Sequence, residues 1–186
     1  MSILTQTLPK GIVSHGHYYA INTDFRTWLK FSELVSDKQI PPFKKAERII
    51  ELCYKDRLPD SFDDAMTALM EFYAPKAAAK KCGGRSGKKE ARVFSFSEDA
   101  DLIYAAFLSE YGIDLCRTEL HWWQFRALFS ALPQDCRLMQ VVGFRSTDPG
   151  EIKDSKKRSF YRKMRRLYAL GQENEIEPAD ILAELF

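Results

Sequence analysis

Few side chains in this sequence have both the type and the spacing that chemistry requires. His15 and His17 flank Gly16, a spacing that could place two imidazoles on one metal ion, but no cysteine or acidic ligand lies near them. Glycine between two short apolar runs is instead typical of a hairpin turn. We therefore interpret this segment as the tip of a β-hairpin and expect no metal ion or other cofactor.

Cys82 is the other residue with a local setting for chemistry, because the neighbouring Lys80 and Lys81 could lower the pKa of its thiol. A nucleophilic cysteine also needs a positioned base, and nothing in the sequence ties one of the three histidines to Cys82. The run Gly83-Gly84-x-x-Gly87-Lys88 lacks the following Ser or Thr of a phosphate loop. No set of residues predicts an active site, and we expect no enzymatic activity.

The hydrophobic pattern that must position these residues is mainly helical. After the hairpin at 12–21, apolar residues recur near helical spacing in seven further segments, namely about 24–36, 43–57, 62–74, 97–111, 118–132, 135–143 and 153–166. A short terminal helix is predicted at 178–185. We expect a mainly α fold, a helical bundle of about seven or eight helices with a small N-terminal β-hairpin.

Composition changes sharply at 76–92, which divides the chain. This segment holds seven Lys or Arg against one Glu, with three glycines, and is typical of a solvated, flexible loop. The sequence therefore predicts a hairpin with N-terminal helices over 1–75 and a basic flexible loop over 76–92. The C-terminal helices over 93–186 are expected to pack with the N-terminal part as one domain.

A second basic run lies at 153–166, with eight Lys or Arg against one Asp and with aromatic residues interleaved. The two runs together carry +13, so the rest of the chain carries −11 to reach the net charge of +2. Such segregation could bind nucleic acid, whose phosphates give salt-sensitive affinity. Charge runs are more often solvated or matched by an acidic protein. Nucleic acid is therefore the alternative partner, and a protein partner is favoured.

The adjacent pair Trp122 and Trp123 is the most conspicuous apolar cluster. The helix that contains it is apolar around most of its circumference, which favours packing in the core. The alternative is a recognition surface, because Trp and Arg are enriched in interface hot spots. The candidate partner-binding residues are Trp122, Trp123, Phe125 and Phe129, as far as that helix is exposed, and Arg158, Arg162, Arg165 and Arg166 of the basic run.

Cysteine usage and the apolar segments predict a protein of the cytoplasm. The four cysteines contain no C-x-x-C pair, which is typical of reduced thiols in a cytosolic protein. The opening residues MSILTQTLPKG lack the pattern of a signal peptide. No apolar run reaches the roughly 18 residues of a membrane span, so we expect no membrane association.

Several motifs resemble those of a known family. Tyr-Gly-Ile-Asp-Leu at 111–115 is followed by Leu-His-Trp-Trp-x-Phe at 120–125, and then by Phe-Arg at 144–145 and the basic helix. The N-terminal half adds Ile-Asn-Thr-Asp-Phe-Arg at 21–26. Over nearly its whole length the chain resembles the bacteriophage gene-product-15 family, found in tailed phages and prophages of Gram-positive bacteria.

The resemblance implies a viral protein of tail assembly. Genes of this family tend to lie near that of the tape-measure protein, which implies a chaperone that binds the tape-measure protein or another tail protein in the host bacterial cytoplasm. It carries over no catalytic or binding residues. A nucleic-acid-binding phage factor and a structural virion component are the alternatives, and the oligomeric state, a homo-oligomer included, is left open.

Overall fold

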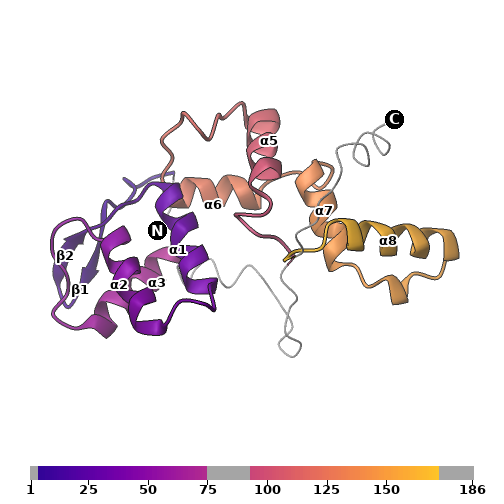
Figure 1. Ribbon diagram of the computed structural model, residues 1–186. Coiled ribbons are helices and arrows are strands. Elements are labelled where there is room, and N and C mark those ends of the chain that lie inside the picture. The colour runs from indigo at the N-terminus through magenta and orange to yellow at the C-terminus, as the bar shows by residue number, and fades with distance from the viewer. Residues whose placement is uncertain (1–3, 75–92, 172–186) are drawn as a thin grey trace. The chain divides into compact units, whose positions relative to one another are not determined.

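The computed structural model describes residues 4–74 and 93–171. These residues form a two-stranded antiparallel hairpin, seven α-helices and one short 3-10 helix (Figure 1). The predicted fold class, mainly α with a small N-terminal hairpin, is therefore confirmed. By their contacts the described residues group into two compact units. The first contains residues 4–74 and 107–132, and the second contains residues 93–106 and 133–171.

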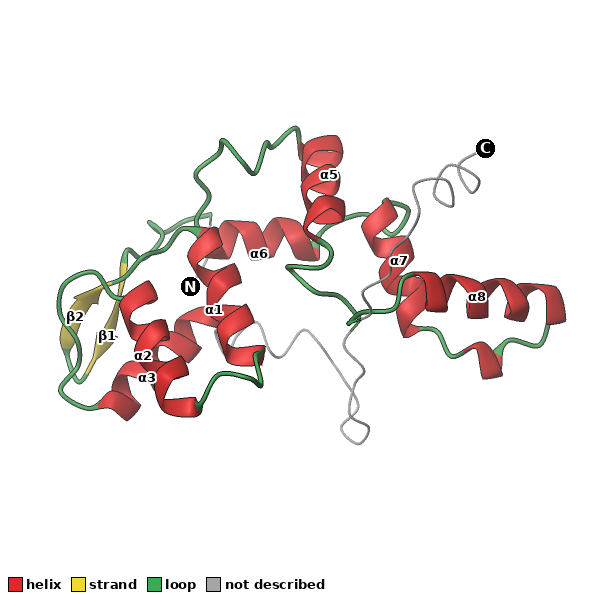
Figure 2. Cartoon of the chain, viewed as in Figure 1, coloured by secondary structure: helices red, strands yellow, loops and turns green. Residues whose placement is uncertain are grey.

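The hairpin joins β1 (Gly11–Ser14) to β2 (His17–Ala20) through a two-residue turn (Figure 2). His15 and Gly16 have φ angles of 48° and 79°, the left-handed conformation that both central residues of a type I′ turn adopt. The turn predicted around Gly16 is confirmed. The imidazole of His15 lies 3.1 Å from the carboxylate of Asp64, which belongs to the helix packed against β1.

Three helices follow the hairpin, and each begins at a residue type that favours a helix start. Pro42 supplies the fixed φ that suits a first helical residue, and the side chains of Asp24 and Ser61 accept backbone N–H groups at the starts of the other two. The helices are α1 (Phe25–Ser36), α2 (Pro42–Cys53) and α3 (Phe62–Tyr73).

The second of these helices is shorter than the segment 43–57 that the hydrophobic pattern predicts. It ends at Cys53 because the next residue, Tyr54, is extended and forms an isolated bridge with Ile21. The backbone N–H of Asn22 donates to the carbonyl oxygen of Cys53 at 2.8 Å. Pairing with the end of the hairpin therefore overrides the helical pattern at this point.

Residues 107–132 bring two later elements into the first unit. The sequence predicts a helix from Thr118, but the helix begins only after His121. His121, the residue before it, is held in an extended conformation, because it bridges Asp24 and the N–H of Trp122 donates to the carbonyl of Thr23 at 2.8 Å. The elements are the last part of α5 (Ala100–Tyr111) and α6 (Trp122–Ser130).

Aromatic rings fill the core of the first unit. Trp28 of α1 is fully buried, and its ring centroid lies 4.8 Å from Phe72 of α3 and 6.3 Å from Trp122 of α6. Phe125 is also fully buried, and it stacks on Phe107 at 5.0 Å. Buried aromatic rings of this kind contribute strongly to the stability of a hydrophobic core.

The second unit contains two whole helices, joined by a segment that includes a short 3-10 helix. Leu138 and Val141 of the first helix are fully buried, and Met164 of the second is buried. The side chain of Asp154 accepts the N–H of Lys157 and so caps the second helix. The elements are α7 (Arg137–Ser146), the 3-10 helix (Pro149–Glu151) and α8 (Ser155–Leu167).

Some predictions concern residues outside the described ranges, and one stays a prediction. The flexible loop at 76–92 and the terminal helix at 178–185 lie outside the described residues. The packing of both halves as one domain stays a prediction. Across residues 4–74 and 93–171, no helix has the length and apolar character needed to cross a bilayer.

Candidate functional site

The four aromatic candidates on α6 occupy two different environments. Trp122 is 2% exposed and Phe125 is fully buried, so both belong to the core and present no surface to a partner in this structure. Trp123 and Phe129 are half-buried. The ring of Phe129 stacks on Phe125 at 5.9 Å. Trp122 and Phe125 therefore pack in the core, which is the interpretation that the sequence favours.

The two tryptophans cap the end of α3, a role that sequence reasoning missed. The last carbonyls of a helix have no partner within it. Here the indole Nε1 of Trp123 donates to the carbonyl of Phe72 at 2.9 Å, and that of Trp122 donates to the carbonyl of Tyr73 at 3.0 Å. The guanidinium of Arg126 donates to the same Tyr73 oxygen at 2.7 Å. Adjacent tryptophans are thus explained by two adjacent carbonyls.

His121 fixes the start of α6. Its Nδ1 accepts the backbone N–H of Trp123 at 3.1 Å. The backbone N–H of His121 donates to the side-chain oxygen of Gln124 at 3.2 Å, which completes a capping box. Since Nδ1 is an acceptor, the proton lies on Nε2, which donates to the carbonyl of Pro9 at 3.0 Å. Burial lowers the pKa of His121, and the hydrogen bond to Pro9 opposes that shift.

We expect stability to fall at mildly acidic pH because of His121. Its pKa is lower in the folded chain than in the unfolded chain, so its contribution is present above about pH 6.5 and is lost as the pH falls through the folded value. A protonated Nδ1 could no longer cap α6, and a cap is worth about 1 kcal/mol. Urea unfolding at several pH values measures the loss. His121→Asn keeps a capping side chain that does not titrate, so parallel losses in both proteins would contradict this assignment.

The arginine candidates lie on α8, and three of the four face solvent. Arg162, Arg165 and Arg166 are exposed. Arg158 is half-buried, and its guanidinium donates to the carbonyls of Ile152 at 2.8 Å and of Lys153 at 3.1 Å. Arg158 therefore tethers the segment before α8, and the other three arginines form the surface available to a partner.

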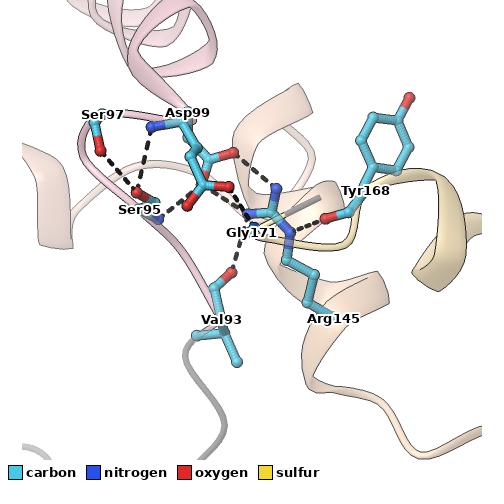
Figure 3. Close-up of polar contacts among 8 residues, drawn as sticks. Val93, Ser95, Ser97, Asp99, Arg145, Tyr168 and Gly171 are labelled. Atoms are coloured by element: carbon cyan, nitrogen blue, oxygen red, sulfur yellow. Dashed lines mark hydrogen bonds and ion pairs between the residues drawn. The ribbon is translucent and has the colours of Figure 1, made fainter. Parts of the chain in front are cut away.

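A buried ion pair holds the end of α8 in place (Figure 3). The guanidinium of Arg145 meets both carboxylate oxygens of Asp99 at 2.7 and 2.8 Å, with side chains only 9% and 2% exposed. The same guanidinium donates to the carbonyl oxygens of Tyr168 and Val93. Asp99 also accepts the N–H of Ser95 at 2.9 Å. This network ties residues on both sides of α8 to the start of α5.

Sequence reasoning missed this pair as well. Arg145 lies two residues beyond the helix predicted at 135–143, whereas α7 extends to Ser146, and Asp99 lies near the start of the helix predicted at 97–111. A sequence-level signal existed in the Phe-Arg at 144–145 that carried part of the family resemblance. The ring of Phe144 lies 5.8 Å from that of Phe160 and 5.6 Å from that of Tyr161, so this dipeptide joins α7 to the aromatic side of α8.

The residues considered for metal or redox chemistry have other surroundings. In the part of the chain that the structure describes, no three His, Cys, Asp or Glu side chains gather as metal ligands would. Cys53 is buried, and burial raises the pKa of its thiol to about 12, which keeps it protonated. Cys82 lies outside the described residues.

Comparison with known proteins identifies the family. The family described as Bacteriophage Gp15 protein matches residues 4–170. Curated proteins and solved structures give no match. The matched range contains the capping tryptophans, the Arg145–Asp99 pair and all of α8, and it agrees with the resemblance carried by the motifs at 111–115 and 120–125. The chain therefore belongs to the bacteriophage Gp15 protein family.

Proposed function

We propose that this phage protein is a tail-assembly factor, a chaperone that binds the tape-measure protein and catalyses no reaction. The observation that carries the proposal is the solvent face of α8. That face presents Arg162, Arg165 and Arg166 on a helix held by the buried Arg145–Asp99 pair. A basic face on a helix that is held in place steers an acidic partner toward the protein and fixes the orientation in which it binds.

The proposed mechanism is shielding before polymerisation. A tape-measure protein exposes apolar and helical surface until the tail-tube protein assembles around it. A chaperone would cover part of that surface in the host cytoplasm and leave as the tube grows. Of the aromatic candidates on α6, only the half-buried Trp123 and Phe129 could add to such contacts.

Co-expression with the tape-measure protein encoded nearby tests this proposal. We expect the tape-measure protein to be retained on the tagged chain and to become more soluble, and raised salt should weaken the retention because α8 is basic. Absence of retention at both low and high salt would contradict the proposal. A chaperone should also be missing from purified virions by mass spectrometry, whereas a structural virion component would be present.

Nucleic-acid binding is the second candidate function, and the same basic face favours it. Each phosphate that a Lys or Arg neutralises makes the affinity fall more steeply with salt. Retention on duplex DNA at low salt, with a steep loss on raising the salt, would support this function. No retention at low salt would remove it.

A further inference from the structure

Helix α8 carries a dense positive charge. Seven of the thirteen residues of α8 are Lys or Arg and none is acidic. Of the three acids that most closely precede α8, Asp148 and Asp154 accept backbone N–H groups at the starts of the 3-10 helix and of α8, and Glu151 is exposed in the 3-10 helix. Among the described residues, no ion pair reaches Arg162 or Arg166. These two arginines are therefore available to a partner of opposite charge.

Three exposed basic residues and one exposed serine form a row with helical spacing. Ser159, Arg162, Lys163 and Arg166 follow one another at i, i+3, i+4 and i+7, so they share one face of α8, and all four are exposed. Arg162 and Arg166 are about 6 Å apart along the helix axis, from a rise of about 1.5 Å per residue. Two acids one turn apart on a second helix have the same spacing.

An aromatic ring borders this row. Phe160 is 49% exposed, although it belongs to a residue type that is usually buried. Its ring packs edge-to-face against Phe144 at 5.8 Å and against Tyr161 at 5.9 Å, so its orientation is fixed before any partner arrives. A fixed aromatic ring beside arginines is the composition of a protein-interface hot spot.

We propose that α8 binds an acidic amphipathic helix of a protein partner. Arg162 and Arg166 pair with acids one turn apart on that helix, and Phe160 covers an apolar side chain next to them. This deepens the proposed function and rests on it for the class of partner, a protein. The contact joins a charged row, which gives orientation, to an aromatic anchor, which excludes water.

Phe160 provides a way to distinguish a protein partner from nucleic acid. A duplex offers the row its phosphates, and backbone contacts of that kind depend on charge alone. Removal of the Phe160 ring should therefore leave DNA affinity unchanged, whereas a protein helix with an apolar residue at the contact would lose affinity.

Fluorescence anisotropy with the full chain tests the proposal. The probe is a labelled synthetic helical peptide with Glu residues at i and i+4 and Leu beside them, compared with a scrambled peptide of the same composition. We expect Arg162→Glu with Arg166→Glu to weaken binding more than about 10-fold, and Phe160→Ala to weaken it about 5- to 10-fold. The scrambled peptide should bind more weakly than the ordered one.

Matched controls come from the first unit, where Lys55, Arg57 and Phe43 are exposed. Lys55→Glu with Arg57→Glu makes the same change in net charge, and Phe43→Ala removes an equally large ring that is 79% exposed. Both controls should bind the ordered peptide like the unmodified chain. Circular dichroism of every variant checks that the fold is kept.

Three binding results would overturn the proposal. These are equal binding of the scrambled peptide, no effect of Phe160→Ala, and tighter binding of a DNA duplex than of the ordered peptide. Self-association that the α8 substitutions abolish would assign the face to a second copy and would also overturn it. Peptide binding through α8 without retention of the tape-measure protein would support the proposal and contradict the proposed function. If the tape-measure protein is retained equally by the chain with and without the α8 substitutions, the proposed function is supported and the proposal for α8 is contradicted.

Discussion

Replacing Arg145 with Met is expected to destabilise the fold by about 3–5 kcal/mol. The substitution leaves the carboxylate of Asp99, whose side chain is 2% exposed, without its counter-charge. Asp99→Asn should cost a similar amount, because it leaves the guanidinium buried beside a neutral amide. Losses of this size are a large part of the stability of an ordinary domain. Urea unfolding followed by circular dichroism measures them.

An exposed ion pair of the same chemistry provides the control. Arg117 lies 3.4 Å from Asp114, and its side chain is 88% exposed, so Arg117→Met should cost less than about 1 kcal/mol. The double variant at Asp99 and Arg145 should cost clearly less than the sum of the two single variants, because the pair is lost only once. If the losses of the two single variants simply added, or if Arg145→Met and Arg117→Met cost the same stability, burial would not be what makes the Arg145–Asp99 pair important.

Trp122→Ala is expected to destabilise the first unit by about 3–5 kcal/mol, the usual cost of emptying a buried aromatic site. The ring is 2% exposed and stacks on Tyr73 at 5.1 Å, and its Nε1 caps the carbonyl of that same residue. Trp122→Phe keeps most of the ring and loses the hydrogen bond, so it should cost about 1–3 kcal/mol. The same unfolding assay measures both variants.

Phe43→Ala is the matched control for this series, because that ring is 79% exposed. It should change stability by no more than about 0.5 kcal/mol. If Trp122→Ala kept normal stability but lost a binding partner, Trp122 would be an interface residue and its placement in the core would be contradicted.

The sequence was sufficient for the parts of the fold that local chemistry decides. Gly16 between two apolar runs predicts the hairpin, and the helices predicted at 24–36 and 62–74 begin next to the capping residues Asp24 and Ser61. These features depend on residues only a few positions apart. The burial of Trp122 and Phe125 also follows from the apolar circumference of their helix.

Contacts between distant residues account for what could not be predicted. The late start of α6 depends on the bridge between His121 and Asp24, which hydrophobic periodicity does not encode. The pairing of Arg145 with Asp99 joins residues 46 positions apart, so neither residue signals its partner. For the candidate site, the sequence identified the basic row on α8, but the half-exposed ring of Phe160 emerged only from its packing on Phe144.

The capping of α3 by α6 has a consequence for synthesis on the ribosome. The donors on Trp122 and Trp123 are translated about 50 residues after the carbonyls they satisfy. At roughly 5–20 residues per second, several seconds separate the two events. During that interval the C-terminal end of α3 lacks its final partners, and the core around Trp28 lacks the rings of α6. The first unit is therefore completed only after residue 132 has left the ribosome, although most of its chain was made long before.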